Sequence, residues 1–144
     1  MRQRQTYTAS DSGRVAATVL RMASLAEATL SALERRVLDR FVRLLEADLG
    51  TDLHAVWLFG SRARGEEPGP ESDVDVLVVA TSASFDDHLR AVRLVHEAAD
   101  AEGANPAFFA VKLYDPDRVA QRREIRSFFM QEVDRDKIVL YGEP

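Results

Sequence analysis

The sequence predicts an α/β (α+β) domain in which a small mixed β-sheet carries helices packed mainly on one face. Two observations support this fold class. Apolar runs typical of strands alternate with amphipathic helical segments, and capping signals separate them. No internal repeat or low-complexity block interrupts this order. The predicted strands cover residues 53–59, 73–80, 107–114 and, as a short closing strand, 138–141.

The first predicted helix begins after Ser31, because Ser31 and Glu34 have the spacing of a capping box. Apolar residues then recur every three or four positions, which is typical of a helix with one buried face. Gly50 ends the helix. We expect this face to pack against the sheet, through Val37, Leu38, Phe41, Leu44, Leu45 and Leu49.

A second helix follows strand 73–80, with the segment Ser84 to Asp87 as its N-terminal cap and Gly103 at its end. One apolar stripe along it predicts the buried face. On this stripe, His96 is interpreted as a core or boundary histidine rather than a catalytic one. The residues expected to face inward are Leu89, Val92, Val95, His96 and Ala99.

A third helix is expected to begin at Asp115 and Pro116, which suit the N-cap and the first helical position. Its arginines predict a solvated basic face, with contact to a phosphate or an acidic partner as the alternative. Its apolar side is expected to comprise Val119, Ile125, Phe128, Phe129 and Val133, and its basic side Arg118, Arg122, Arg123 and Arg126.

Composition narrows the class of protein. The 144 residues, 46% hydrophobic and 30% charged, suit one domain with one core. The absence of cysteine excludes disulfides, thiolate metal sites and a cysteine nucleophile. The longest apolar run is too short to cross a bilayer and no signal-peptide pattern is present, so we expect a cytoplasmic protein with no membrane partner. A net charge of −5 does not indicate nucleic-acid binding.

Residues 1–21 are predicted to be a flexible basic tail, and residues 22–144 the folded domain. The tail is rich in Ser, Thr and Gln and contains four arginines against one aspartate. Two alternatives stay open. The tail could contact a nucleic acid or an acidic partner, or the native chain could start at Met22.

The residues that suggest chemistry lie between the first two predicted strands. Asp73 and Asp75 are two positions apart, which on a strand places both carboxylates on one face and turns Val74 and Val76 into the core. Two like charges held this close repel each other, and either raise the pKa of one aspartate or favour a bound cation. Carboxylate oxygens are hard ligands, so Mg²⁺ or Mn²⁺ is the expected ion.

The segment 60–65 follows strand 53–59 and suits a phosphate. Gly60 permits close approach of the backbone, and Ser61 supplies a hydroxyl group. Arg62 and Arg64 can neutralise charge on a triphosphate. The alternative interpretation is an ordinary turn followed by a solvated, charged strand edge.

Together, Gly60-Ser61-Arg62-Ala63-Arg64-Gly65 and Ser72-Asp73-Val74-Asp75 resemble the signature of the minimal nucleotidyltransferases, small members of the DNA polymerase β-type superfamily. The specific motif spans residues 60–75, and a looser pattern of elements spans 24–142. The resemblance implies the polymerase β-like nucleotidyltransferase fold. It also implies transfer of a nucleoside monophosphate, AMP from ATP, to a hydroxyl acceptor with Mg²⁺ or Mn²⁺. By resemblance, Asp73 and Asp75 are the catalytic metal ligands, and Gly60, Ser61, Arg62 and Arg64 bind the nucleotide.

One departure from the family pattern leaves the activity open. Active members carry a third carboxylate on a later strand, whereas strand 107–114 contains no acid. Asp115 lies just beyond it and is better explained as a helix cap. Without a third ligand, a second metal ion would be poorly held. The sequence therefore leaves two functions, an Mg²⁺-dependent nucleotidyltransferase or a weakly active or inactive module that binds a nucleotide or a protein.

The resemblance also implies a partner. Many minimal nucleotidyltransferases are antitoxins of a helical HEPN-class toxin, which they neutralise by binding it or by adding AMP. Transfer to a small molecule such as an antibiotic is less favoured, because the chain has no second domain to form an acceptor pocket. The acceptor, the nucleotide and the oligomeric state stay open.

Overall fold

The computed structural model describes residues 27–69 and 72–144, so the predicted tail and the alternative start at Met22 lie outside the described residues. The described part contains one four-stranded sheet in the order β3-β2-β1-β4. The strands are β1 (Leu53–Phe59), β2 (Val74–Ala80), β3 (Phe109–Tyr114) and β4 (Ile138–Gly142), close to the predicted ranges.

The sheet is mixed, as predicted. β1 pairs antiparallel with β2 on one side and with β4 on the other, whereas β2 and β3 are parallel. Parallel neighbours need a crossover connection, and here it contains a helix, α3 (Phe85–Glu102). The register places Asp75 opposite Phe59 of β1 and beside Ala110 of β3.

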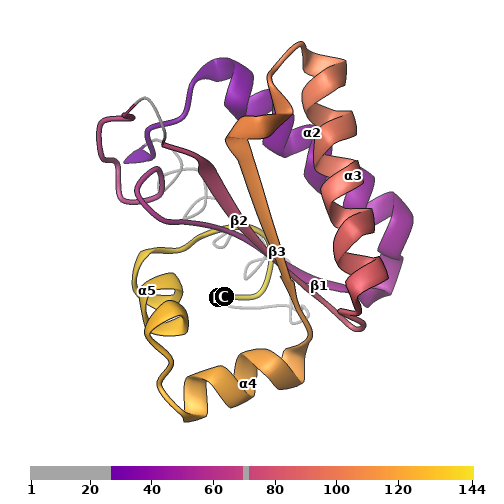
Figure 1. Cartoon of the computed structure of the whole chain (residues 1–144), viewed down its shortest axis with the longest axis vertical. Helices are drawn as coiled ribbons and strands as arrows, with labels where there is room; N and C mark the ends of the chain where they lie inside the picture. The colour runs from indigo at the N-terminus through magenta and orange to yellow at the C-terminus, as the bar shows by residue number, and fades with distance from the viewer. Residues whose placement is uncertain (1–26, 70–71) are drawn as a thin grey trace, which may run out of the picture.

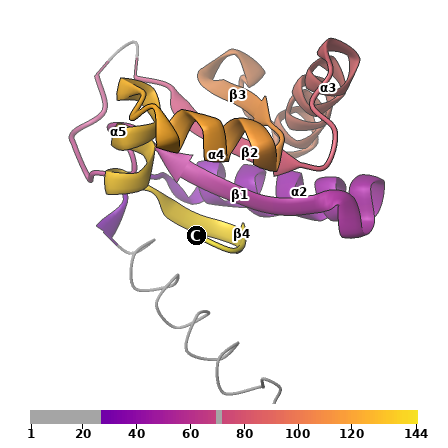
Figure 2. The ribbon, with the colours of Figure 1, turned by 90° about the horizontal axis from the view of Figure 1, so that it is seen from below.

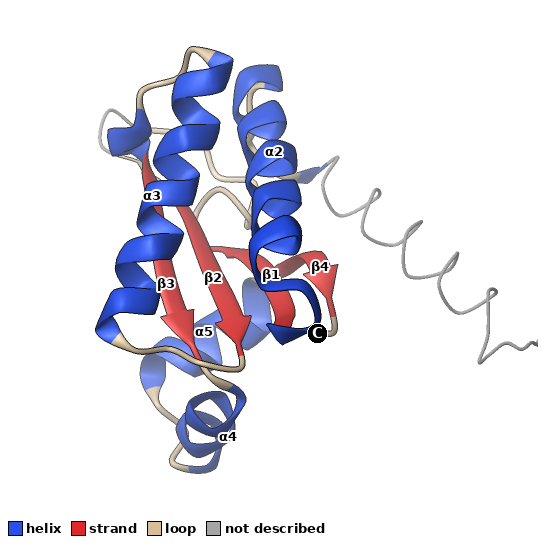
Figure 3. Ribbon diagram, turned by 90° about the vertical axis from the view of Figure 1, so that its right-hand side faces the viewer, coloured by secondary structure: helices blue, strands red, loops and turns tan. Residues whose placement is uncertain are grey.

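Two long helices, α2 (Ala32–Leu49) and α3, lie side by side on one face of the sheet (Figures 1 and 3). Both predicted caps are confirmed. Ser31 and Glu34 form a capping box at the start of α2, and Ser84 and Asp87 form another at the start of α3.

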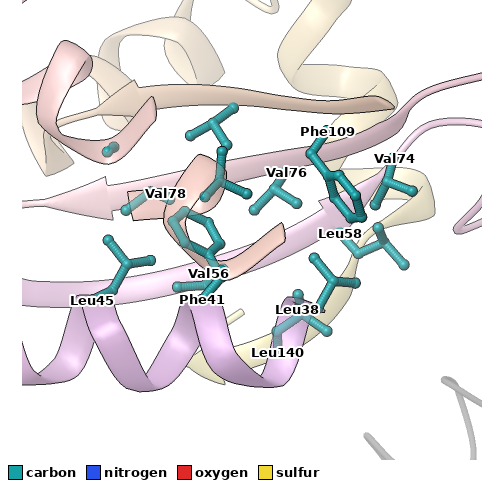
Figure 4. Close-up of a cluster of buried hydrophobic side chains, with 14 of the residues drawn as sticks. Leu38, Phe41, Leu45, Val56, Leu58, Val74, Val76, Val78, Phe109 and Leu140 are labelled. Atoms are coloured by element: carbon teal, nitrogen blue, oxygen red, sulfur yellow. The ribbon is translucent and has the colours of Figure 1, made fainter. Parts of the chain in front are cut away.

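The larger hydrophobic core lies between these helices and the sheet (Figure 4). Phe41 of α2, Leu58 of β1 and Val76 of β2 are all 0% exposed. Val74, Val76 and Val78 point to this side of β2, so the alternation predicted for the strand is confirmed. Asp75, between two of them, therefore points to the opposite face.

Two short helices, α4 (Pro116–Glu124) and α5 (Phe128–Asp136), cover part of the opposite face (Figure 2). Trp57, Leu77, Met130 and Val133 form a second, smaller cluster there. The predicted fold class is confirmed, with the long helices on one face and these two short helices added on the other.

The single helix predicted after Asp115 is in fact two helices. Arg126 adopts a left-handed backbone conformation (φ 53°), and the hydroxyl of Ser127 accepts a hydrogen bond from the Met130 amide as the cap of α5. A continuous helix is incompatible with both features. Ile125 and Phe128 flank the break and are 60% and 77% exposed, so they do not belong to the buried face that the sequence predicted.

The predicted buried face of α3 was also partly wrong. Leu89 and His96 are exposed, so His96 is neither a core nor a boundary residue. Small residues occupy most of the helix interface instead, which allows α3 to pack closely on its neighbours. The buried residues are Ala91, Val95, Ala98 and Ala99.

β3 begins two residues later than predicted, because the side chain of Asn105 caps a 3-10 turn over Pro106–Phe108.

None of the helices in residues 27–69 and 72–144 is long and apolar enough to cross a membrane.

Candidate functional site

The segment between β1 and β2 begins with a tight turn. Gly60 has a positive φ of 81°, which favours glycine, and its carbonyl accepts a hydrogen bond from the Arg64 amide at 3.1 Å. The Ser61 carbonyl accepts one from Glu66 at 3.1 Å. Among the described residues, the amides at the start of the turn, those of Ser61 and Arg62, have no hydrogen-bond partner. These amides are available to an anion.

Asp75 lies directly against this turn. A Cβ atom added to Gly60 would lie 2.6 Å from Oδ2 of Asp75, so glycine is what allows the backbone and the carboxylate to approach. Burial raises the pKa of Asp75, and the charge of Asp73 raises it further. The two aspartates of the motif therefore repel each other here, as the sequence predicted, and a cation would relieve that repulsion.

Arg62 is buried and has no free donor. Its guanidinium group donates to both carboxylate oxygens of Glu34, at 2.8 and 3.0 Å, and to the Thr29 carbonyl at 2.9 Å. The hydroxyl and the carbonyl of Ser72 accept the two remaining bonds, each at 3.2 Å. An arginine has five N–H donors, and all five are used. Arg62 holds the segment in place, and direct phosphate contact by Arg62, as the sequence predicted, would require one of these bonds to break.

Glu34 is a site-positioning residue that the sequence indicated only as a helix cap. It accepts the Ser31 amide at 2.8 Å while it binds Arg62. Burial alone would raise the pKa of Glu34, but the hydrogen bonds from Arg62 and Ser31 outweigh burial and lower it. α2 and the motif turn are thus joined by a mostly buried ion pair.

Arg64 is oriented differently. Its guanidinium group contacts Glu66 at 2.6 Å and Asp136 of α5 at 2.9 Å, and these bonds raise its pKa. Two of its five donors are used in these bonds, and its side chain is one third exposed. Arg64 can therefore donate to a phosphate without leaving its partners.

The start of the turn, Arg64 and Asp75 line a pocket of about 390 Å³. α5 supplies one wall, which the sequence analysis did not anticipate. The Phe129 ring packs edge-on against Phe59, with ring centroids 5.3 Å apart. Glu132 is a second carboxylate of the lining besides that of Asp75. The lining residues are Phe59, Gly60, Ser61, Arg64, Asp75, Phe129 and Glu132.

The third carboxylate of the family pattern is absent from β3, as the sequence indicated. The register places Ala110 beside Asp75, so Ala110, Lys112 and Tyr114 are the positions that share its face. Phe109 is buried on the other face. Asp115 caps α4 by accepting the Arg118 amide at 2.7 Å, and it lies five residues beyond Ala110, at the far end of the strand. Asp115 therefore cannot complete the site.

The donor set fits a divalent ion held with the help of a nucleotide. Within residues 27–69 and 72–144, no three His, Asp or Glu side chains lie close enough to hold a metal ion by themselves. Asp73 and Asp75 offer two hard carboxylates, and Mg²⁺ commonly completes its shell with water and phosphate oxygens. These residues fit Mg²⁺ or Mn²⁺ together with a nucleoside triphosphate.

Comparison with protein families agrees with a site for a metal ion and a nucleotide. The family model described as "Polymerase beta, Nucleotidyltransferase" matches residues 46–143, which include the whole motif. The chain belongs to this nucleotidyltransferase family. A search of curated proteins finds none that matches the chain.

Three similar solved structures come from toxin–antitoxin complexes. A chain from the structure of a mutant MntA–HpeT complex is 22% identical with a TM-score of 0.46, over 73% of this chain and 72% of that chain. A toxin–antitoxin complex with AMP-PNP is 23% identical with a TM-score of 0.47, over 74% and 73%. A chain from the structure of the tri-AMPylated Shewanella oneidensis HEPN toxin in complex with MNT antitoxin is 20% identical with a TM-score of 0.44, over 74% of this chain and 71% of that chain. Because these sequence identities and TM-scores are low, the family assignment rests on the family model and the motif.

Proposed function

We propose that the protein transfers AMP from ATP to a hydroxyl acceptor, with Mg²⁺ or Mn²⁺ as cofactor. The observation that supports this most directly is the approach of Asp75 to Gly60 at the edge of the pocket. A metal bound by Asp75 would there be next to phosphates bound by the turn. The family assignment supports the reaction class.

Each site residue has a role in this proposal. Asp73 and Asp75 hold the metal, which neutralises charge on the phosphates when bound. Gly60 and Ser61 present the turn to the β- and γ-phosphates, and Arg64 donates to them. Arg62 holds the turn in position through its bonds to Glu34, Thr29 and Ser72. The exposed part of the Phe129 ring offers an apolar surface on which the base can stack.

In the transfer step, the acceptor oxygen bonds to the α-phosphorus while the bond from that phosphorus to the bridging oxygen breaks. The bond electrons leave with pyrophosphate, and the proton of the acceptor passes to a carboxylate. Glu132 is the candidate for this proton, since it lines the pocket and is not assigned to the metal. Most of the rate would come from positioning and charge neutralisation.

An Asp75→Asn variant tests the nucleotide and metal site. ATP with Mg²⁺ should raise the melting temperature of the wild type, because a ligand that binds only the folded state stabilises it. The variant should lose this shift. It should also melt slightly higher without ligand, because burial and the charge of Asp73 raise the pKa of Asp75, and the charged form is therefore less favourable in the folded state at neutral pH. An unchanged ligand shift would place the nucleotide elsewhere.

The absence of an acid on the site face of β3 supports a second candidate, a module that binds a nucleotide or a protein and does not transfer AMP. For either function we propose a HEPN-class toxin as partner, following the motif resemblance, and a cytoplasmic location. Incubation with labelled ATP, Mg²⁺ and the product of the neighbouring gene separates the two. Label on the partner supports transfer, and complex formation without label supports the binding module.

A further inference from the structure

Lys112 occupies an unexpected place for a cation in this fold. It is on the face of β3 that Asp75 shares, two positions beyond the residue paired with Asp75. Strand geometry places two residues about 6–7 Å apart, a distance that a lysine side chain can span. On the strand where active members carry the third carboxylate, this chain has no acid and one lysine.

The surroundings of Lys112 show that its ammonium group is directed toward the site. Its Nζ lies 5.5 Å from the centre of the Phe129 ring, which lines the pocket. The Lys112 ammonium group therefore lies beside the aromatic wall of the pocket, on the face of the sheet that carries Asp75.

Lys112 also has unused hydrogen-bonding capacity. Within the described residues it has no ion pair or hydrogen bond, whereas Lys137, the other lysine of the chain, bonds to Asp134 at 2.8 Å. An ammonium group has three donors and is a common phosphate ligand. Lys112 is exposed, so solvent and ligand can reach it.

We propose that Lys112 binds a phosphate of the nucleotide and takes the place of a second metal ion. This inference rests on the proposed function and adds a ligand to it. The site then needs one divalent ion, held by Asp73 and Asp75, because the ammonium group supplies the remaining positive charge. The missing acid on β3 is thereby explained, since a carboxylate for a second metal has no role beside a fixed cation.

Amine labelling tests the contact without measuring activity. The protein is treated with an acetylating reagent, with and without Mg²⁺ and a non-hydrolysable ATP analogue, and the labelled lysines are quantified by mass spectrometry. The analogue should protect Lys112 several-fold and leave Lys137 unchanged, because a bound phosphate blocks the amine. Equal labelling of Lys112 with and without the analogue overturns the inference.

Titration calorimetry with the same analogue and Mg²⁺ provides the second measurement. Lys112→Met should weaken binding about tenfold, the typical cost of losing one hydrogen bond to a charged group. Lys112→Arg should recover most of the affinity, and the control Lys137→Met should bind as the wild type does. Wild-type affinity in Lys112→Met overturns this inference alone. No binding by the wild type overturns the proposed function as well.

Discussion

The two faces of the sheet are organised for different purposes. On one face, two helices of 18 residues each cover the strands and enclose a core of fully buried aliphatic and aromatic side chains. On the other face, two helices of nine residues each cover part of the strands, and the pocket lies between α5 and the turn that follows β1. Most of the buried core lies under the long helices, whereas the pocket residues lie beside the short helix α5.

The turn at residues 60–65 is joined to both faces. Arg62 connects it to Glu34 of α2, and Arg64 connects it to Asp136 of α5. The first pair is mostly buried, and its arginine uses its three remaining donors on Thr29 and Ser72, whereas Arg64 keeps donors for a ligand. Two arginines of one motif thus have different functions, one structural and one directed at the pocket.

The largest expected effect follows from removing core volume on the face of the long helices. Phe41→Ala should lower the free energy of unfolding by about 3–5 kcal/mol, because Phe41 is fully buried in the larger cluster. Met130→Ala, fully buried in the smaller cluster, should cost about 2–3 kcal/mol. Urea unfolding measures both. A larger loss for Met130→Ala would reverse the ranking of the two faces.

The next effect separates the two arginines. Arg62→Ala should lower the free energy of unfolding by about 3 kcal/mol, because it leaves the mostly buried Glu34 carboxylate without its partner. Arg64→Ala should cost at most about 1 kcal/mol, since the Arg64 side chain is one third exposed and Asp136 keeps Arg135 as a partner.

For ligand binding we expect the reverse order, with Arg64→Ala having the larger direct effect. Arg64→Ala should weaken binding of ATP with Mg²⁺ directly, as measured by calorimetry at a temperature where both variants are folded. Arg62→Lys should not restore stability, because an ammonium group cannot form the two-pronged contact with Glu34. Equal stability losses in Arg62→Ala and Arg64→Ala would show that the two arginines are not distinguished as the structure indicates.

A pH series tests the bond between the turn and α5. Hydrogen bonds from Arg135 and then from Arg64, opposed by burial, lower the pKa of Asp136 from 3.8 to about 2. A lowered folded-state pKa adds stability above the unfolded-state value, and that stability is lost as the pH falls toward 2. Asp136→Asn should therefore cost about 1–2 kcal/mol at pH 7, allowing for the exposure of Arg135, and almost nothing at pH 2. A cost independent of pH would contradict this interpretation.

The smallest expected effect on stability is also the most specific for the site. Gly60 and Gly103 have nearly the same positive φ, 81° and 80°, but only at Gly60 would a Cβ atom meet another group, Oδ2 of Asp75. Gly60→Ala and Gly103→Ala should each cost about 1 kcal/mol through the backbone. Only Gly60→Ala should also lose the stabilisation by ATP with Mg²⁺, because Asp75 must move. Equal ligand shifts in the two variants would separate Gly60 from the site.

Local patterns in the sequence were sufficient for most of the fold. Ser31 with Glu34 and Ser84 with Asp87 predict their helix starts, since a cap depends on residues three positions apart. The alternation around Asp75 likewise predicts which side chains enter the core. The break near Arg126 was missed, because one apolar pattern ran through residues that lie on two separate helices.

The sequence by itself determined the motif, the family pattern and the pair of aspartates, because these depend on neighbouring positions. Only the tertiary structure decided what each charged side chain contacts. Arg62 meets a carboxylate 28 positions away and Arg64 meets one 72 positions away, and no local pattern distinguishes the two. The same holds for Lys112, whose position on the same face as Asp75 depends on the parallel register of β2 and β3. Contacts between distant segments are fixed by how the elements pack, and packing is a property of the whole chain.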